Sequence, residues 1–159
     1  MTNVPATDPS SGSQDRSSHD VNLSVVDLYT IGIGPSSSHT VGPMRAGYRF
    51  CLELEARNLL ANTGSVIVDL YGSLALTGKG HATDTAVIMG LCGQRPRSID
   101  PDQIPPTIAA IDANKQLSLY GQHAVAFNRD TNLVFHFTET LPQHSNGMRI
   151  TAFDFFFFF

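Results

Sequence analysis

Apolar residues recur at helical spacing through residues 43–62, and charged residues occupy many of the positions between them. The apolar positions are Met44, Tyr48, Cys51 and Leu52. This period predicts a helix whose first residue is Pro43, because proline needs no hydrogen-bonded N–H at that position. Thr40 or Gly42 could cap the helix, and Asn62 and Gly64 would end it.

The segments that follow change pattern twice. Residues 65–71 are rich in β-branched side chains and are bounded by glycines, which predicts a strand. A glycine-punctuated connection covers residues 72–81, and the apolar run 83–91 predicts a second helix that ends near Gly93. Residues 94–106 are rich in proline and are expected to form a loop, with a third short helix over 107–117.

The last third of the chain alternates with a period of two. Residues 123–127, 132–138 and 147–153 are each predicted to be a strand. In the second of them, Leu133, Phe135 and Phe137 would share one face and Val134, His136 and Thr138 the other. The order, βαβα followed by several strands, predicts an α/β fold, an α+β sandwich with a small mixed sheet and helices.

The two ends of the chain differ from this pattern. Residues 1–22 are polar and serine-rich, and we interpret them as a disordered leader. The folded part of the chain should begin with residues 23–29, which could form a short helix or a strand. We expect one domain over residues 23–154. Residues 155–159 are all phenylalanine, and we interpret this aberrant tail as the product of a truncation or frameshift.

Composition narrows the class of protein. The chain has 159 residues, of which 42% are hydrophobic, and this is enough for one packed core. Its ten Lys and Arg residues are scattered and its net charge is -4, which argues against a nucleic-acid partner. No apolar run approaches the roughly 20 residues of a membrane span. We therefore expect a cytoplasmic protein. Cys51 and Cys92 form no CxxC pair and are expected to be buried thiols, although a disulfide between them stays open.

The loop before the first predicted helix carries the densest polar chemistry. Gly32, Gly34 and Pro35 would shape a tight turn. Four hydroxyls follow within five residues, those of Ser36, Ser37, Ser38 and Thr40. Helix N–H groups beginning just after them would make a pocket for a carboxylate or phosphate. His39 adds a group that can donate, accept or bind metal. The competing interpretation is an ordinary helix cap with surplus serines.

Two further loops contain candidate residues. The loop 72–84 resembles a phosphate-binding P-loop but has one residue too many between Gly72 and Gly78, and Gly80 replaces the hydroxyl residue after Lys79. Lys79, His81 and Asp84 could instead face an anionic ligand or a partner, unless this is a plain surface loop.

The third loop, 144–148, contains His144 and an Asn146-Gly147 pair, which is a turn signal that could also line a site. His123 and His136 fall in strand patterns and are expected to be structural or exposed. Neither an HExxH metal motif nor a nucleophile elbow is present in the sequence.

The run 24–44, which contains Gly-Ile-Gly-Pro-Ser-Ser-Ser-His-Thr, closely resembles the N-terminus of bacterial-type iron–sulfur L-serine dehydratases (L-serine ammonia-lyases). The runs 71–84 and 144–148 match the same family in the same order. The resemblance covers residues 23–154.

This resemblance implies the family's β domain, which packs on a mostly helical catalytic domain or chain. It implies conversion of L-serine to pyruvate and ammonia without pyridoxal phosphate. A [4Fe–4S] cluster would act as Lewis acid on the substrate hydroxyl. The cluster ligands would lie outside this chain, because its two cysteines do not match them and cannot supply the usual four thiolates. A homo-oligomer would be compatible with the family.

The resemblance also implies roles for individual residues. The hydroxyls of Ser36, Ser37, Ser38 and Thr40 would hold the serine carboxylate. His39, Lys79 and His81 would be catalytic, and which histidine is the base is left open. Asp84, His144, Asn146 and Gly147 would complete substrate binding. Two other hypotheses remain: a non-catalytic module that binds serine or another small carboxylate, and an inert oligomerisation domain.

Overall fold

The strand predicted at residues 65–71 forms and begins two residues earlier, as β1 (Thr63–Tyr71). The computed structural model describes residues 37–78, 82–142 and 146–155. Within these residues, β1 is the centre of a five-stranded mixed sheet, which confirms the predicted α/β class with a small mixed sheet. β1 runs parallel to β3 (His123–Ala126) and β4 (Leu133–His136) and antiparallel to β5 (Met148–Asp154). The fifth strand, β2 (Gln116–Leu119), pairs with β3.

β3 and β4 lie one after the other along the same edge of β1, and a short helix connects them. β3 pairs with β1 at Ser65, and β4 takes over from Val68 to Tyr71. Between the two strands lies α6 (Arg129–Asn132). The side-chain amide of Asn132 donates to the carbonyl oxygen of Val66 at 3.0 Å, so this backbone group is satisfied where the strand pairing is interrupted.

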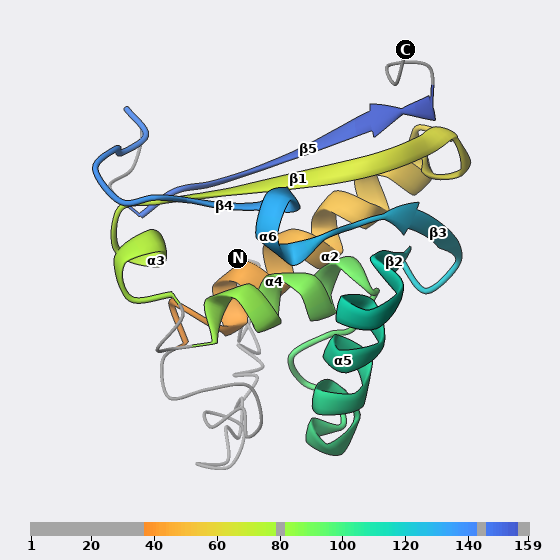
Figure 1. The fold of residues 1–159 in the computed structure, drawn as a ribbon, viewed down its shortest axis with the longest axis horizontal. Helices are drawn as coiled ribbons and strands as arrows, with labels where there is room; N and C mark the ends of the chain where they lie inside the picture. Colours follow the sequence, from red (N-terminus) through yellow and green to blue (C-terminus); the bar gives the residue numbers. More distant parts are fainter. Residues whose placement is uncertain (1–36, 79–81, 143–145, 156–159) are drawn as a thin grey trace, which may run out of the picture.

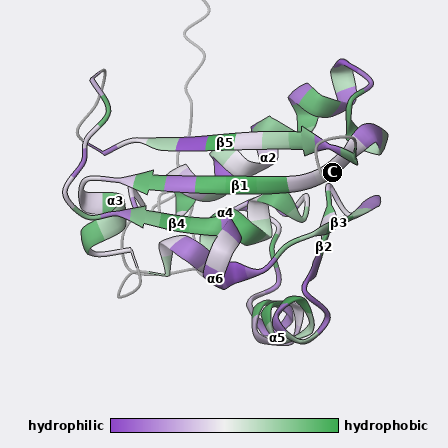
Figure 2. Ribbon diagram, turned by 45° about the horizontal axis from the view of Figure 1, so that its top comes forward, coloured by the Kyte–Doolittle hydropathy of each residue, from purple (hydrophilic) through white to green (hydrophobic). Residues whose placement is uncertain are grey.

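Two long helices cover one face of β1. In Figure 1, α2 (Val41–Ala56) and α4 (Thr83–Leu91) lie together beneath β1 and β5, and α5 (Ile104–Asn114) lies to their side. The alternate residues Val66, Val68 and Leu70 of β1 are fully buried against them. Figure 2 shows the hydrophobic colour along much of β1. Apolar burial on this face is therefore what holds the helices on the sheet.

The backbones of α2 and α4 approach closely because glycines stand at their contact. A Cβ atom at Gly90 would lie 2.1 Å from the carbonyl oxygen of Met44, and one at Gly47 would lie 2.7 Å from that of Val87. No side chain fits at either distance. The two glycines therefore set the separation of the helices.

The prediction for residues 94–117 was wrong in part. Ile104 begins α5, and Pro105 and Pro106 lie in its first turn, where N–H groups have no partner within the helix. A 3-10 helix, η2 (Pro101–Gln103), precedes it. The helix ends at Asn114, and β2 follows with Leu117 and Leu119 fully buried. Prolines are typical of a loop, but here two of them lie in the first turn of a helix, and residues 116 and 117, predicted to end that helix, begin β2.

The prediction of the first helix was wrong at both ends. α2 starts at Val41, two residues before Pro43, and ends at Ala56, six residues before Asn62; a 3-10 helix, η1 (Leu60–Asn62), leads into β1. The second predicted helix has the bounds of α4. β4 ends at His136, and the Phe137 side chain, predicted to share a face with Leu133, is 55% exposed. The expected leader, the element at 23–29 and residues 156–159 of the tail lie outside the described residues.

Replacing Gly90 by alanine should destabilise the fold, because its Cβ would meet the Met44 carbonyl oxygen at 2.1 Å. We expect a loss of about 1–3 kcal/mol in the free energy of unfolding, measured by urea denaturation. The control is Gly42→Ala, whose Cβ would meet nothing nearer than the Ser37 carbonyl oxygen at 3.8 Å. Equal stability of the two variants would contradict this account of the helix contact.

Candidate active site

The candidate site lies at the C-terminal end of β1. Gly72 follows the strand with a φ of 56°, a backbone conformation that favours glycine, and the short helix α3 (Ser73–Leu76) begins at once. The N–H of Tyr71 donates to the Gly147 carbonyl oxygen at 2.9 Å, and the N–H of Gly72 donates to that of Glu139 at 3.1 Å. Gly147, one of the predicted substrate-binding residues, is therefore hydrogen-bonded to the last residue of β1.

Ser73 connects all three loops that the sequence singles out. Its hydroxyl lies 3.1 Å from Nε2 of His39, which belongs to the first loop. Its backbone N–H donates to the side-chain oxygen of Asn146, from the third loop, at 3.2 Å. Ser73 itself belongs to the second loop. Segments separated by 34 and 73 residues in the sequence therefore meet at one serine.

His39 is held at both ring nitrogens. Its Nδ1 lies 2.9 Å from the hydroxyl of Ser38, and its Nε2 faces Ser73. A hydroxyl can donate or accept a hydrogen bond, so both partners can adapt to either neutral tautomer or to the charged ring. The two contacts therefore fix the orientation of the half-buried imidazole.

The N-terminus of α2 opens beside His39. Thr40, one of the two residues predicted to cap the helix, is the N-cap residue and is only 1% exposed. Its side chain makes no capping hydrogen bond, and its carbonyl oxygen accepts from the N–H of Met44 at 3.0 Å. Ser37 and Ser38 are exposed, and the first turn of α2 contains no acidic residue. The positive end of the helix dipole is thus not neutralised by its own helix. This arrangement suits a small carboxylate.

Asp84 lies in a different arrangement. Its carboxylate accepts from Arg129 at 2.8 Å, and the same guanidinium reaches Asp112 at 2.9 Å. This network ties α4, α5 and α6 together. A part for Asp84 in substrate binding stays a prediction. Ser36, Lys79, His81 and His144 lie outside the described residues.

A second polar cluster, which the sequence did not predict, adjoins the end of β1. His136 Nε2 lies 2.7 Å from Asp69, and its ring stacks on Tyr71 with centroids 4.4 Å apart. The strand register brings His136 opposite Tyr71. No pattern in the sequence predicts that these two residues lie side by side. The role of Ser73 was also missed, although a hydroxyl directly after a glycine at the end of a predicted strand could have indicated it.

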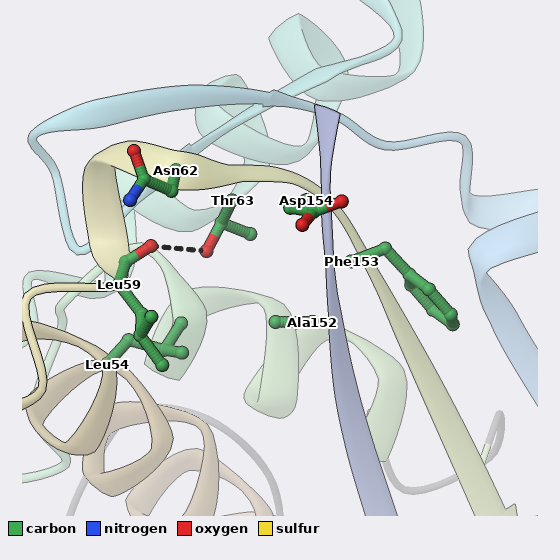
Figure 3. Close-up of a pocket in the computed structure, with 7 residues that line it drawn as sticks. All are labelled: Leu54, Leu59, Asn62, Thr63, Ala152, Phe153 and Asp154. Atoms are coloured by element: carbon green, nitrogen blue, oxygen red, sulfur yellow. Dashed lines mark hydrogen bonds between the residues drawn. The ribbon is translucent and has the colours of Figure 1, made fainter. Parts of the chain in front are cut away.

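A cavity of about 230 Å³ lies at the other end of β1. Figure 3 shows Leu54 and Leu59 on one side of it and the backbone of β5 on the other, with the ring of Phe153 pointing away. The Thr63 hydroxyl donates to the Leu59 carbonyl oxygen at 3.0 Å. None of the predicted site residues that the structure describes lines this cavity.

Comparison with known proteins identifies the family of the chain. The family model described as "Serine dehydratase beta chain" matches residues 24–155. The chain belongs to this serine dehydratase beta-chain family.

Curated relatives with the same family name support the assignment. L-serine dehydratase 2 of Escherichia coli is 55% identical over 131 residues, which cover 82% of this chain and 29% of that protein. L-serine dehydratase of Streptomyces coelicolor is 48% identical over 132 residues, covering 83% of this chain and 29% of that protein. The chain therefore spans less than a third of the length of these relatives.

The two cysteines of the beta chain do not fit an iron–sulfur cluster. Both are free thiols, and the Cys51 thiol donates to the Leu91 carbonyl oxygen at 3.3 Å. Burial raises the pKa of each to about 12, which opposes the thiolate that iron requires. Among the described residues, no group of three or more His, Cys, Asp or Glu side chains could hold a metal ion.

No helix in the part of the chain that the structure describes is long and apolar enough to cross a membrane.

The raised pKa predicts inert thiols in the folded beta chain. Relative to the ordinary value of 9.0, a pKa of about 12 lowers the thiolate fraction roughly 1,000-fold at mildly alkaline pH. An aromatic disulfide reagent should therefore modify Cys51 and Cys92 slowly in buffer and rapidly in urea. Fast modification of either thiol in the folded chain would contradict this burial.

The hydrogen bond between His39 and Ser73 should appear in a double-mutant cycle. His39→Ala and Ser73→Ala should couple by about 0.5–1.5 kcal/mol in the free energy of unfolding. The control pairs His39→Ala with Thr107→Ala on α5, whose hydroxyl donates to the Gln103 carbonyl oxygen. That pair should be additive. Additivity of the first pair would show that the contact contributes nothing to stability.

Proposed function

We propose that this chain supplies the substrate-side half of an L-serine dehydratase active site. The observation that carries the proposal is the junction at Ser73, where His39 and Asn146 converge. It places an imidazole, hydroxyls and the N-terminus of α2 around one point. Membership of the serine dehydratase beta-chain family supports L-serine as the substrate.

Each part of the junction has a chemical task in this proposal. The N-terminus of α2 and the hydroxyls of Ser37 and Ser38, with Ser36 before them, hold the carboxylate of serine. His39 serves as the acid–base or orienting group, kept in place by Ser38 and Ser73. The substrate loses its α-proton and its hydroxyl group to give aminoacrylate. Tautomerisation to the imine and hydrolysis then yield pyruvate and ammonia.

The remaining part of the site would come from a second domain or chain. The matched region is 29% of the length of L-serine dehydratase 2, which leaves room for a catalytic domain in such proteins. We propose that a domain of this kind binds against this chain and carries the cysteines for a [4Fe–4S] cluster. The thiols of Cys51 and Cys92, whose pKa is raised, do not fit that role.

A chimera tests the proposal. Residues 24–154 of this chain would replace the matching segment of L-serine dehydratase 2, and pyruvate formation from L-serine would be measured. We expect activity, and we expect His39→Ala to lower kcat by about 100-fold or more.

The matched control is His123→Gln, which removes a histidine whose Nε2 lies 2.9 Å from the Thr63 carbonyl oxygen, at the other end of β1. This variant should keep kcat within about threefold, since it touches no part of the junction. A folded, cluster-loaded chimera without activity, or equal losses in both variants, would refute the proposal.

The alternative function, a non-catalytic serine-binding or regulatory module, gives a different result. It requires the isolated chain to bind L-serine saturably in a calorimetric titration. Binding that survives His39→Ala but is lost with Ser37→Ala and Ser38→Ala would favour the module. A half site should bind serine only weakly until the second domain is present.

A further inference from the structure

Four arginines line one groove away from the junction at Ser73. Arg45 and Arg49 stand one turn apart on α2, and Arg95 and Arg97 lie in the loop that follows α4. The groove has a volume of about 590 Å³ and is completed by Tyr48, Pro96 and Ser98. These four side chains are drawn from only ten Lys and Arg residues in a chain of net charge -4. The basic groove is therefore a local concentration of positive charge in a chain whose net charge is negative.

The arginines of the basic groove have no carboxylate partner in the part of the chain that the structure describes. Two arginines elsewhere are paired: Arg57 lies 2.5 Å from Glu53, and Arg129 binds Asp84 and Asp112. Arg149 has no ion pair among the described residues, and its Cζ lies 6.0 Å from the centre of the Tyr71 ring. The nearest acidic residues in the sequence are Asp100, three residues after Arg97, and Glu53, four residues after Arg49. The Asp100 side chain caps η2 by accepting from the Asp102 N–H at 3.0 Å, and Glu53 is the partner of Arg57.

One wall of the basic groove is already organised. The guanidinium of Arg95 donates to the hydroxyl of Tyr48, and its Cζ lies 4.7 Å from the centre of the Tyr48 ring. The Tyr120 ring braces Tyr48 from another direction, with centroids 5.8 Å apart. Arg95 is thus oriented before any ligand arrives, which reduces the entropy that binding would otherwise cost. Pro96, which also lines the groove, is buried.

We propose that the basic groove binds a small polyanion, a molecule with two or more phosphate or carboxylate groups. Guanidinium groups match both oxyanions through paired N–H donors. The Tyr48 ring and the arginine stems offer apolar surface to the body of such a molecule. The volume lies in the range of small-molecule sites, which favours a ligand of this size over an acidic protein surface. This inference does not depend on the proposed dehydratase function.

Calorimetric titration of the chain with pyrophosphate and with citrate tests the proposal and separates the two ligand chemistries. We expect saturable binding of at least one probe with a stoichiometry of one, weakened by added chloride. Arg49→Gln combined with Arg97→Gln should weaken binding about tenfold or more, because both side chains are exposed and lose only their charge. Far-UV circular dichroism would check that the variant is folded.

The matched control is Arg57→Gln, an exposed arginine directly after α2 whose partner is Glu53. It should leave the affinity unchanged. Absence of saturable binding by either probe would overturn the proposal, and so would equal weakening by the control. If the double variant instead weakens association with a separately made catalytic domain while neither probe binds, the groove is a protein interface and the proposal is wrong.

Discussion

The close contact between α2 and α4 is the constraint on which the other features depend. Gly47 and Gly90 let the two backbones meet at a distance that no Cβ permits. This contact sets the position of α2 against the sheet, since Met44 is fully buried at the same place. Because α2 is a single rigid element, its placement also decides what stands before its first turn and along its exposed side.

Before the first turn of α2, the contact determines the geometry of the candidate active site. His39 can reach Ser73 only if the N-terminus of α2 lies beside the C-terminal end of β1. β1 is fixed in turn by its pairing with β4 on one edge and β5 on the other. The same pairing brings Gly147 and Asn146 to this end, so the sheet and the helix pair jointly assemble the three loops around one serine.

Along its exposed side, α2 contributes Arg45 and Arg49 to the basic groove, and the loop after α4 contributes Arg95 and Arg97. The helix contact thus holds two sets of like charges together. Their mutual repulsion is tolerated because the side chains reach solvent. Asp84 and Arg129 show the opposite arrangement, in which partly buried charges are paired and join three helices. The ion pairs of Arg129 thus stabilise the packing of the helices, whereas the arginines of the basic groove face solvent.

The sequence by itself determined the central strand, the second helix, the mixed α/β class and the three loops with candidate chemistry. These features follow from local periodicity and from short polar motifs, which act within a few residues. Only the tertiary structure decided that Ser73 joins the loops, that His136 pairs with Asp69 and that Asp84 binds Arg129. Such contacts depend on strand register and helix separation, which arise when distant segments pack. The start of α5 at Ile104 has a similar cause, since proline in a first turn and proline in a loop look alike until the helix that follows is in place.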